Sequence, residues 1–322
     1  MVAKRIPLIV LGGSDRRSPE LPDSGRGKHP IPGCKGVDIL IEGRPMVETV
    51  VQRLEACGCF GPIYLAGPSQ VYGQVRTAAR LIDTDGTFGG NIRASMETVR
   101  AAHPGLPVSF ITCDVLPDSA TLSGLMEEYW RQAPCDLWFP LVRAPEDTEA
   151  LGAFAWKPIY HIAPAEGEPA LRILPGHWVV ADPEALRLDL LYRLFQIGYR
   201  TRNRSIGRRR VSMVRGVVLE LLYHDLLHLL GLRLPTLTWN VLGAGIPAGA
   251  ALRDGTITRA GLEEAMRRIF VKDRHRRRYP ERRILVPLIE GLSLALDVDT
   301  EEEAREIGGD TVELSGPPPA AC

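Results

Sequence analysis

The chain lacks the features that mark secreted, membrane-spanning and disulfide-rich proteins. Its six cysteines, at positions 34, 57, 59, 113, 135 and 322, include no CxxC pair, which favours reduced thiols over a disulfide framework or a zinc site. No run of about 18 uncharged apolar residues occurs, so we expect no membrane-spanning helix. The apolar stretch in MVAKRIPLIVLGG is too short for a signal peptide. These absences predict a cytoplasmic protein.

The chain also lacks an excess of charge of either sign. Its 39 basic residues balance 39 acidic ones, and this argues against a protein dedicated to binding nucleic acid. The hydrophobic share of 45% and the charged share of 24% are those of a globular protein, which excludes disordered and fibrous classes. The 322 residues suffice for two domains or for one large α/β domain with an insertion.

Strands and helices alternate along the first 145 residues. Apolar runs predict strands at 6–11, 62–66, 108–112 and 137–142. Helical spacing predicts helices from Pro45 to Leu54 and at 92–102, between these strands. This alternation implies βαβ crossovers, and hence a Rossmann-like, mainly parallel sheet with helices on both faces.

The pattern becomes mainly helical in the middle of the chain. We expect strand-like pieces at 159–162 and 178–181, helices at 183–197, 211–230 and 259–270, and a last strand at 292–298. The predicted organisation is an α/β core of residues 1–145 and 284–308, a mostly helical insertion of residues 146–283, and a tail of residues 309–322. The apolar faces of helices 184–197 and 211–230 are expected to pack against each other in preference to lipid.

A glycine pair ends the first predicted strand, in Leu11-Gly12-Gly13. Glycines there let the backbone turn sharply and approach a ligand, with free N–H groups directed at an anion or a base edge. The segment matches neither the GxGxxG fingerprint nor the P-loop. A tight turn without a ligand explains a glycine pair equally well.

Two aspartate motifs follow predicted strands. In FITCDVLP, Asp114 lies just past a strand, in the crevice where parallel sheets bind ligands; a helix cap is the alternative. In LSLALDVDTEEEARE, Asp297 and Asp299 share one face of an extended segment, with no basic residue within five positions. Magnesium would relieve their repulsion. The alternative is an exposed strand end at which Thr300 caps a helix.

The order of these motifs resembles the nucleotidyltransferase superfamily with the glycosyltransferase-A-like fold, which includes sugar-phosphate nucleotidylyltransferases and molybdenum cofactor guanylyltransferases. The matching pieces are LGGSDRR, a following lysine, and GRPM at a helix start. The chain departs from the pattern in having LGG where LAGG is usual. A long Pro- and Gly-rich loop also precedes the lysine, so that Lys28 rivals Lys35. The resemblance covers about residues 5–145 and 284–308.

The resemblance implies an enzyme that transfers NMP from an NTP to a phosphorylated small molecule such as a sugar phosphate, with Mg²⁺ or Mn²⁺. The implied roles are catalysis for Arg16 and Lys35, metal binding for Asp114, Asp297 and Asp299, and nucleotide binding for Leu11, Gly12, Gly13, Asn91 and Ser95. His177 would face the acceptor, although a structural role beside a turn is the favoured interpretation of a lone histidine, and residues 146–283 would form the acceptor side.

Two alternatives stay open: a metal-dependent glycosyltransferase of the same fold, and a non-catalytic nucleotide-binding protein at a membrane surface. The arginine clusters at 199–210 and 274–283 could bind phosphate or lipid, although solvated faces are the favoured interpretation. His224 and His228 have i, i+4 spacing but lack the Glu of HExxH, so we expect them on a packed helix.

Overall fold

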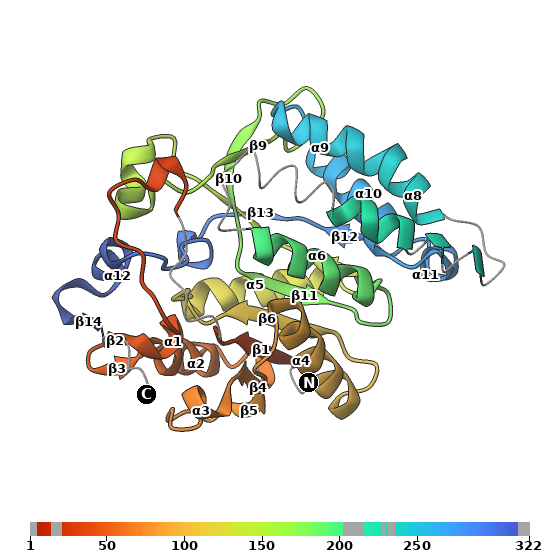
Figure 1. Ribbon diagram of the computed structural model, residues 1–322. Helices are drawn as coiled ribbons and strands as arrows, with labels where there is room; N and C mark the ends of the chain where they lie inside the picture. The colour runs from red at the N-terminus through yellow and green to blue at the C-terminus, as the bar shows by residue number, and fades with distance from the viewer. Residues whose placement is uncertain are drawn as a thin grey trace.

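A seven-stranded sheet forms the centre of the computed structural model, which describes residues 5–13, 21–201, 216–223, 225–226, 229–230 and 236–314 (Figure 1). The strand order is β12 (Ile284–Leu285), β7 (Leu137–Trp138), β11 (Trp178–Ala181), β6 (Val108–Thr112), β1 (Ile6–Leu11), β4 (Phe60–Gly67) and β5 (Arg80–Asp83). Neighbouring strands are parallel except where β11 pairs with β6 and β7. The expected mixed α/β fold with a mainly parallel sheet is confirmed.

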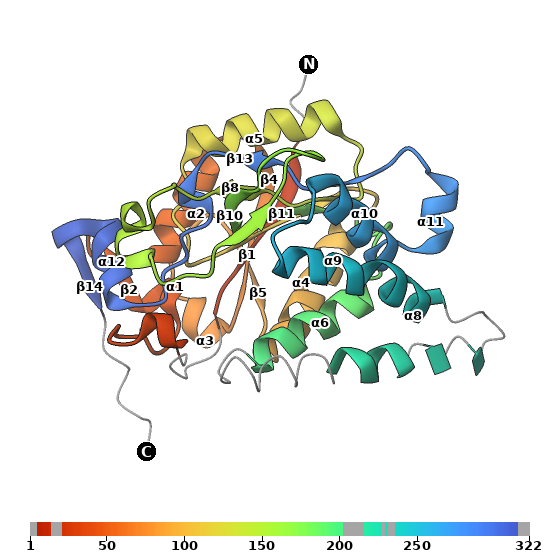
Figure 2. The same cartoon turned by 90° about the horizontal axis from the view of Figure 1, so that it is seen from above.

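Helices cover both faces of this sheet because side chains alternate along its strands. Leu8 and Val10 of β1 pack in one cluster with α2 (Met46–Ala56) and α5 (Ser119–Gln132). Ile9 points the other way and packs with α4 (Phe88–Ala102) and, through Tyr192, α6 (Leu188–Thr201). Figure 2 shows α5 and the α4–α6 pair on opposite sides of the strands.

Two smaller sheets flank the central one. The first has the order β13 (Leu288–Ile289), β8 (Leu141–Arg143), β10 (Leu171–Pro175) and β9 (Tyr160–Ile162); the second has the order β14 (Val312–Leu314), β2 (Ile39–Ile41) and β3 (Arg44–Pro45). Further helices whose bounds are described are α1 (Lys35–Asp38), α3 (Ser69–Tyr72), α8 (Thr236–Asn240), α9 (Ile246–Arg253), α10 (Arg259–Phe270), α11 (Asp273–Arg278) and α12 (Glu301–Gly308). Helices α8 to α11 gather at one end of the molecule (Figures 1 and 2).

Two expected strands differ from the structure. The run 137–142 is divided at Phe139-Pro140 into β7 and β8, which belong to different sheets. The strand expected at 292–298 is wrong, because a single 3-10 turn (Leu292–Leu294) and irregular chain occupy it. Leu294 and Ala295 are nonetheless buried. A short apolar run reports burial, and periodicity alone does not distinguish a buried strand from a buried turn.

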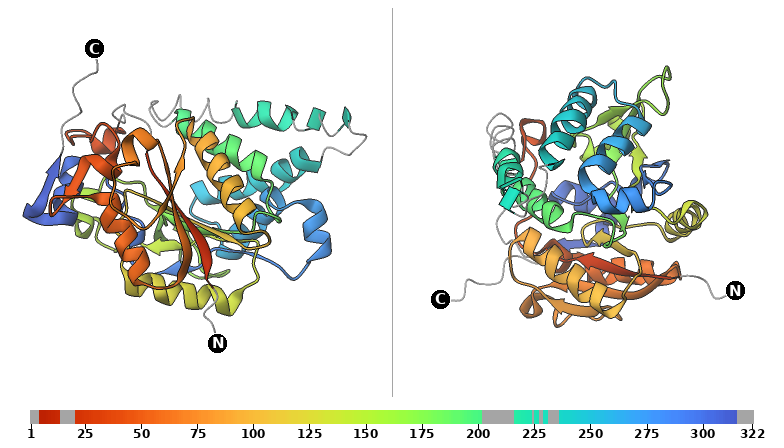
Figure 3. Two further views of the ribbon diagram at one scale, coloured as in Figure 1. Left: turned by 90° about the horizontal axis from the view of Figure 1, so that it is seen from below. Right: turned by 90° about the vertical axis from the view of Figure 1, so that its right-hand side faces the viewer.

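Residues 146–283 supply strands as well as helices. Strands β9, β10 and β11 come from this segment, and β11 lies inside the central sheet. The helix expected from Pro183 starts at Leu188 and ends at Thr201. Within the described ranges, residues 216–223, 225–226 and 229–230 are helical and lie beside α6, in teal in Figure 3. No helix of the described chain is both long and apolar enough to cross a membrane.

Candidate active site

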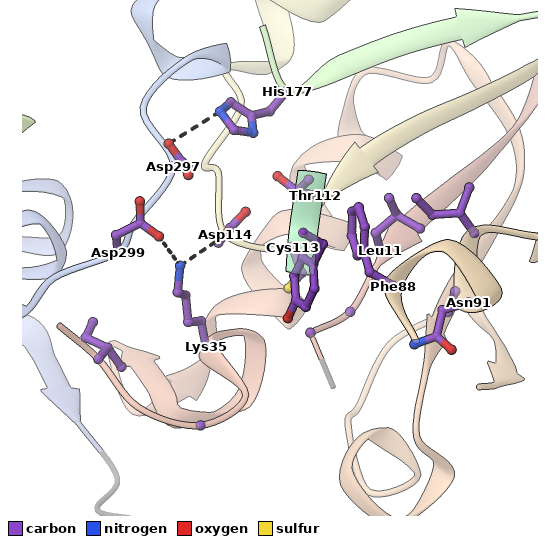
Figure 4. Close-up of a pocket in the computed structure, with 17 residues that line it drawn as sticks. Leu11, Lys35, Phe88, Asn91, Thr112, Cys113, Asp114, His177, Asp297 and Asp299 are labelled. Carbon is purple, nitrogen blue, oxygen red and sulfur yellow. Dashed lines mark hydrogen bonds and ion pairs between the residues drawn. The ribbon is translucent and has the colours of Figure 1, made fainter. Parts of the chain in front are cut away.

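A cavity of about 340 Å³ opens at the carboxyl ends of β1 and β6 (Figure 4). Its wall includes Leu11, Gly12 and Gly13 from the end of β1, and Asp114 from the loop after β6. Lys35, His177, Asp297 and Asp299 also line it. Ligands of open α/β sheets bind at this edge, where the loops after parallel strands meet.

The two glycines of the turn meet different surroundings. A Cβ on Gly12 would lie 2.8 Å from the Tyr72 ring and 2.9 Å from the Ala66 carbonyl oxygen. The Tyr72 hydroxyl donates a hydrogen bond to the Gly13 carbonyl oxygen at 3.1 Å and so supports the turn from below. A Cβ on Gly13 would meet nothing within 4 Å. Gly12 therefore permits close packing beneath the turn, while Gly13 adjoins open space.

Three carboxylates from two distant parts of the chain converge at the cavity. One oxygen each of Asp114, Asp297 and Asp299 lie within 4.8 Å of one another. Backbone hydrogen bonds hold the segments together: Val298 N donates to the Asp114 carbonyl oxygen at 2.8 Å, and Ile31 N donates to that of Asp299 at 3.0 Å. The three aspartates to which the resemblance gives metal binding therefore lie close together, although the last two come from irregular chain.

Two lysines reach the same carboxylates. Lys157 Nζ donates to Asp297 Oδ1 at 2.7 Å and to Asp299 Oδ2 at 2.9 Å, and its side chain is 8% exposed. Lys35 Nζ contacts Asp299 and lies 3.5 Å from Asp114 Oδ2. Sequence reasoning missed Lys157 because it lies 140 positions before Asp297, in a turn with no recognisable motif. Folding alone brings it to the site.

These contacts fix the charge of the cluster. Burial by itself would lower the pKa values of Lys35 and Lys157, but the neighbouring aspartates outweigh it and raise both. Burial would raise the pKa of Asp297, yet His177 and Lys157 hold it well below its usual range. The His177 pKa is raised by Asp297, whose Oδ1 lies 3.3 Å from Nε2, against the effect of burial.

The donor set fits a divalent cation. With buried Glu303, which lies 3.6 Å from Lys157 Nζ, the cluster holds four carboxylates against two lysines and His177. Asp114 Oδ1 is buried and accepts no hydrogen bond from any described residue. Carboxylate oxygens are the ligands that Mg²⁺ and Mn²⁺ prefer. The three aspartates therefore offer hard ligands with spare negative charge.

Of the other predicted site residues, some line the cavity, some lie away from it, and some fall outside the described residues. Asn91 lines the cavity, and its Oδ1 accepts a hydrogen bond from Gly86 N at 2.8 Å. Ser95 is fully buried and donates to the Ile92 carbonyl oxygen at 3.0 Å, away from the cavity wall. Lys28 is partly exposed and does not line the cavity, whereas Lys35 does. Arg16, His224 and His228 lie outside the described residues.

Two aromatic residues that the sequence did not single out line the same cavity. Phe88 starts α4 and Tyr199 lies near the end of α6, and their rings stack at 4.8 Å between centroids.

The second arginine cluster has a structural partner: Arg282 Nε lies 3.0 Å from Oδ1 of Asp136, which is fully buried. The first cluster lies largely outside the described residues.

Comparisons with known proteins establish the fold. No family model and no curated protein matches the chain. A hypothetical transferase from Thermus thermophilus aligns with 94% of this chain and 100% of its own, at 19% identity and a TM-score of 0.51. Two further structures have TM-scores below 0.5. A 4-diphosphocytidyl-2C-methyl-D-erythritol synthase from Anaerococcus prevotii has 9% identity, covers 95% of this chain and 97% of its own, and scores 0.39. The 2-C-methyl-D-erythritol 4-phosphate cytidylyltransferase from Thermus thermophilus has 11% identity, covers 95% and 98%, and scores 0.38. The likeness to the first of these structures shows that the two chains share a mixed α/β fold.

Proposed function

We propose that this protein is a nucleotidyltransferase that transfers NMP from an NTP to a phosphorylated small molecule, such as a sugar phosphate, and releases pyrophosphate. One observation carries the proposal. A single cavity is lined by a glycine turn, by Lys35 and by three converging aspartates, two of which Lys157 contacts. Neutral substrates need no such combination, but a triphosphate and a phosphate acceptor do.

The residues divide naturally between the two substrates. The base and ribose would lie against Gly12, Gly13 and Asn91, and the triphosphate would run toward Lys35. His177 lines the cavity beside Asp297, on the side left for the acceptor. Asp114, Asp297 and Asp299 would hold Mg²⁺ or Mn²⁺, which when bound neutralises phosphate charge and orients the reacting oxygens.

The two substrates are both anionic and repel each other, and these residues would reduce that repulsion. An acceptor phosphate oxygen attacks the α-phosphorus, the bond from that phosphorus to the oxygen bridging to the β-phosphate breaks, and pyrophosphate leaves. Two like charges about 4 Å apart repel by roughly 4 kcal/mol at an effective dielectric of 20. The ammonium groups of Lys35 and Lys157 are held in place before substrates bind, so they can offset this repulsion without reorganising. An ionised phosphate oxygen needs no general base.

The test is a screen of ribonucleoside triphosphates against sugar phosphates, with Mg²⁺ or Mn²⁺ present and pyrophosphate release as the measurement. We expect release with one base and one acceptor class, and its loss in EDTA. In a parallel assay with nucleotide sugars as donors, release of a nucleoside diphosphate would instead identify a glycosyltransferase. Asp299→Asn should lower turnover at least about 100-fold. Asp254→Asn is the matched control, because Asp254 ends α9 on the surface. Absence of pyrophosphate with every pair would overturn the proposal.

A further inference from the structure

The helical residues beside α6 present leucines to solvent. Five of them form a face that we call the leucine face, and each is between 55% and 73% exposed: Leu219, Leu222, Leu226, Leu229 and Leu230. All five belong to the helical residues 216–223, 225–226 and 229–230, which lie at the edge of the molecule (Figure 3). A surface helix of a globular protein ordinarily directs such residues toward the core.

The side of the same helix that faces the protein carries acidic residues. Glu220 pairs with Arg193 of α6, and Asp225 is 9% exposed. Asp225 Oδ1 is buried and receives no hydrogen bond within the described part of the chain. Among the described residues of this helix, Val217 and Leu221 are the ones that join the apolar cluster shared with α6 and α8. The expected packing between the apolar faces of α6 and this helix is therefore limited to a small contact. Most of the leucines of this helix face solvent, while its acidic residues face the protein.

An exposed tryptophan lies on the neighbouring helix. Leu237 of α8 packs into the same cluster as Leu221, while Trp239, two positions later, is 71% exposed. Two positions correspond to about 200° around a helix, so the ring points away from this cluster. Tryptophan is enriched at the boundary between membrane and water, where its apolar ring and polar N–H both find suitable surroundings.

The sequence next to the leucine face is strongly basic. In the sequence, residues 199–215 contain seven arginines just before position 216, and no acidic residue occurs between Asp189 and Glu220. Basic clusters adjoining an amphipathic helix favour anionic lipid headgroups. A two-fold dimer through the leucine face would instead bring two such stretches of like charge to one interface.

We propose that the leucine face is a docking surface for an anionic lipid bilayer, on which this helix lies parallel to the membrane plane. The leucines enter the boundary between headgroups and acyl chains, while Glu220 and Asp225 stay on the side of the protein. The surface is separate from the aspartate cluster, so the proposal does not depend on the proposed activity.

The test is sedimentation of the full chain with phosphatidylcholine vesicles, with or without phosphatidylglycerol. We expect binding to the vesicles that contain phosphatidylglycerol, and weaker binding at high salt because screening reduces the attraction. The double variant L222D/L226D should lose at least about tenfold in vesicle affinity. Leu106→Asp is the matched control, since Leu106 is 42% exposed in the loop between α4 and β6. This variant should bind the vesicles like the wild type.

Three results would overturn the proposal. One is unchanged vesicle affinity of L222D/L226D, with its fold verified by circular dichroism. Another is absence of wild-type binding to either vesicle. The third is a concentration-dependent dimer that the double variant abolishes while neither protein sediments with vesicles, because a second copy would then cover the leucine face.

Discussion

Lys157 changes the interpretation of the aspartate pair. From the sequence, Asp297 and Asp299 had no cation nearby, and a metal was the evident means of joining them. In the structure Lys157 bridges both carboxylates from a distant turn. Its ammonium supplies part of the positive charge that the sequence assigned wholly to a metal. The remaining carboxylate excess is what a divalent cation would use.

This arrangement predicts that the loss of stability caused by Lys157→Ala is larger without metal than with it. Removing one partner from a buried ion pair leaves uncompensated charge, so the variant should be about 3 kcal/mol less stable in EDTA. Mg²⁺ should then stabilise the variant more than the wild type, because more negative charge is unopposed. Urea unfolding in EDTA and in Mg²⁺ measures both. Lys28→Ala is the control, and an equal Mg²⁺ effect in wild type and Lys157→Ala would contradict the prediction.

The two candidate phosphate-binding lysines are separable by activity. Lys35 lines the cavity and contacts the aspartates, whereas Lys28 does neither. On the proposed function, Lys35→Ala should reduce turnover by about 100-fold or more with a smaller change in KM, since its contact strengthens as pyrophosphate leaves. Lys28→Ala should retain activity. Steady-state kinetics of the two variants measures both effects. Loss of activity in Lys28→Ala with activity retained in Lys35→Ala would assign phosphate binding to Lys28.

At the scale of elements, the loop that leads to Lys35 is fastened to the start of α12. Pro30 and Thr300 form an antiparallel bridge, and Glu301 N donates to the His29 carbonyl oxygen at 2.9 Å. Thr300 and Glu303 also form a capping box at the helix start. The capping that the sequence offered as an alternative is real, and it coexists with the aspartate cluster because different side chains perform the two roles.

This fastening should be sensitive to acid through Glu302. Burial opposes the shift, but hydrogen bonds with His29 lower the pKa of Glu302 to about 2. A carboxylate with a depressed folded-state pKa stabilises the protein above its unfolded pKa and loses this contribution as pH falls through the folded value. The wild-type Tm should therefore fall more steeply than that of Glu302→Gln between about pH 4.5 and 2. Parallel Tm curves over this range would contradict the prediction.

At the scale of the whole molecule, local sequence patterns predicted the first strands of the central sheet. They did not predict that the later strand β11 lies inside the same sheet. Asp114 was located correctly because a strand run followed by a carboxylate implies position at a sheet edge. The resemblance implied nucleotide binding for Ser95, but its position on α4 directs it into the core. Neither Lys157 nor the place of β11 follows from local periodicity, because both depend on contacts between segments far apart in sequence.

The place of β11 predicts that residues 1–145 do not fold alone. Strand β11 pairs with β6 on one side and β7 on the other, so its removal separates β7 from the sheet and exposes the backbone of β6. It also removes Trp178, whose fully buried ring packs in the core beside Phe60. A 1–145 fragment should show no cooperative thermal transition and should aggregate, while a chain ending at Leu314 keeps every described strand and should melt like the full chain. Circular dichroism melts of both truncations make the comparison. A cooperative 1–145 fragment would mean that β11 is an addition to a complete sheet, and that the site assembles from two independently folding parts.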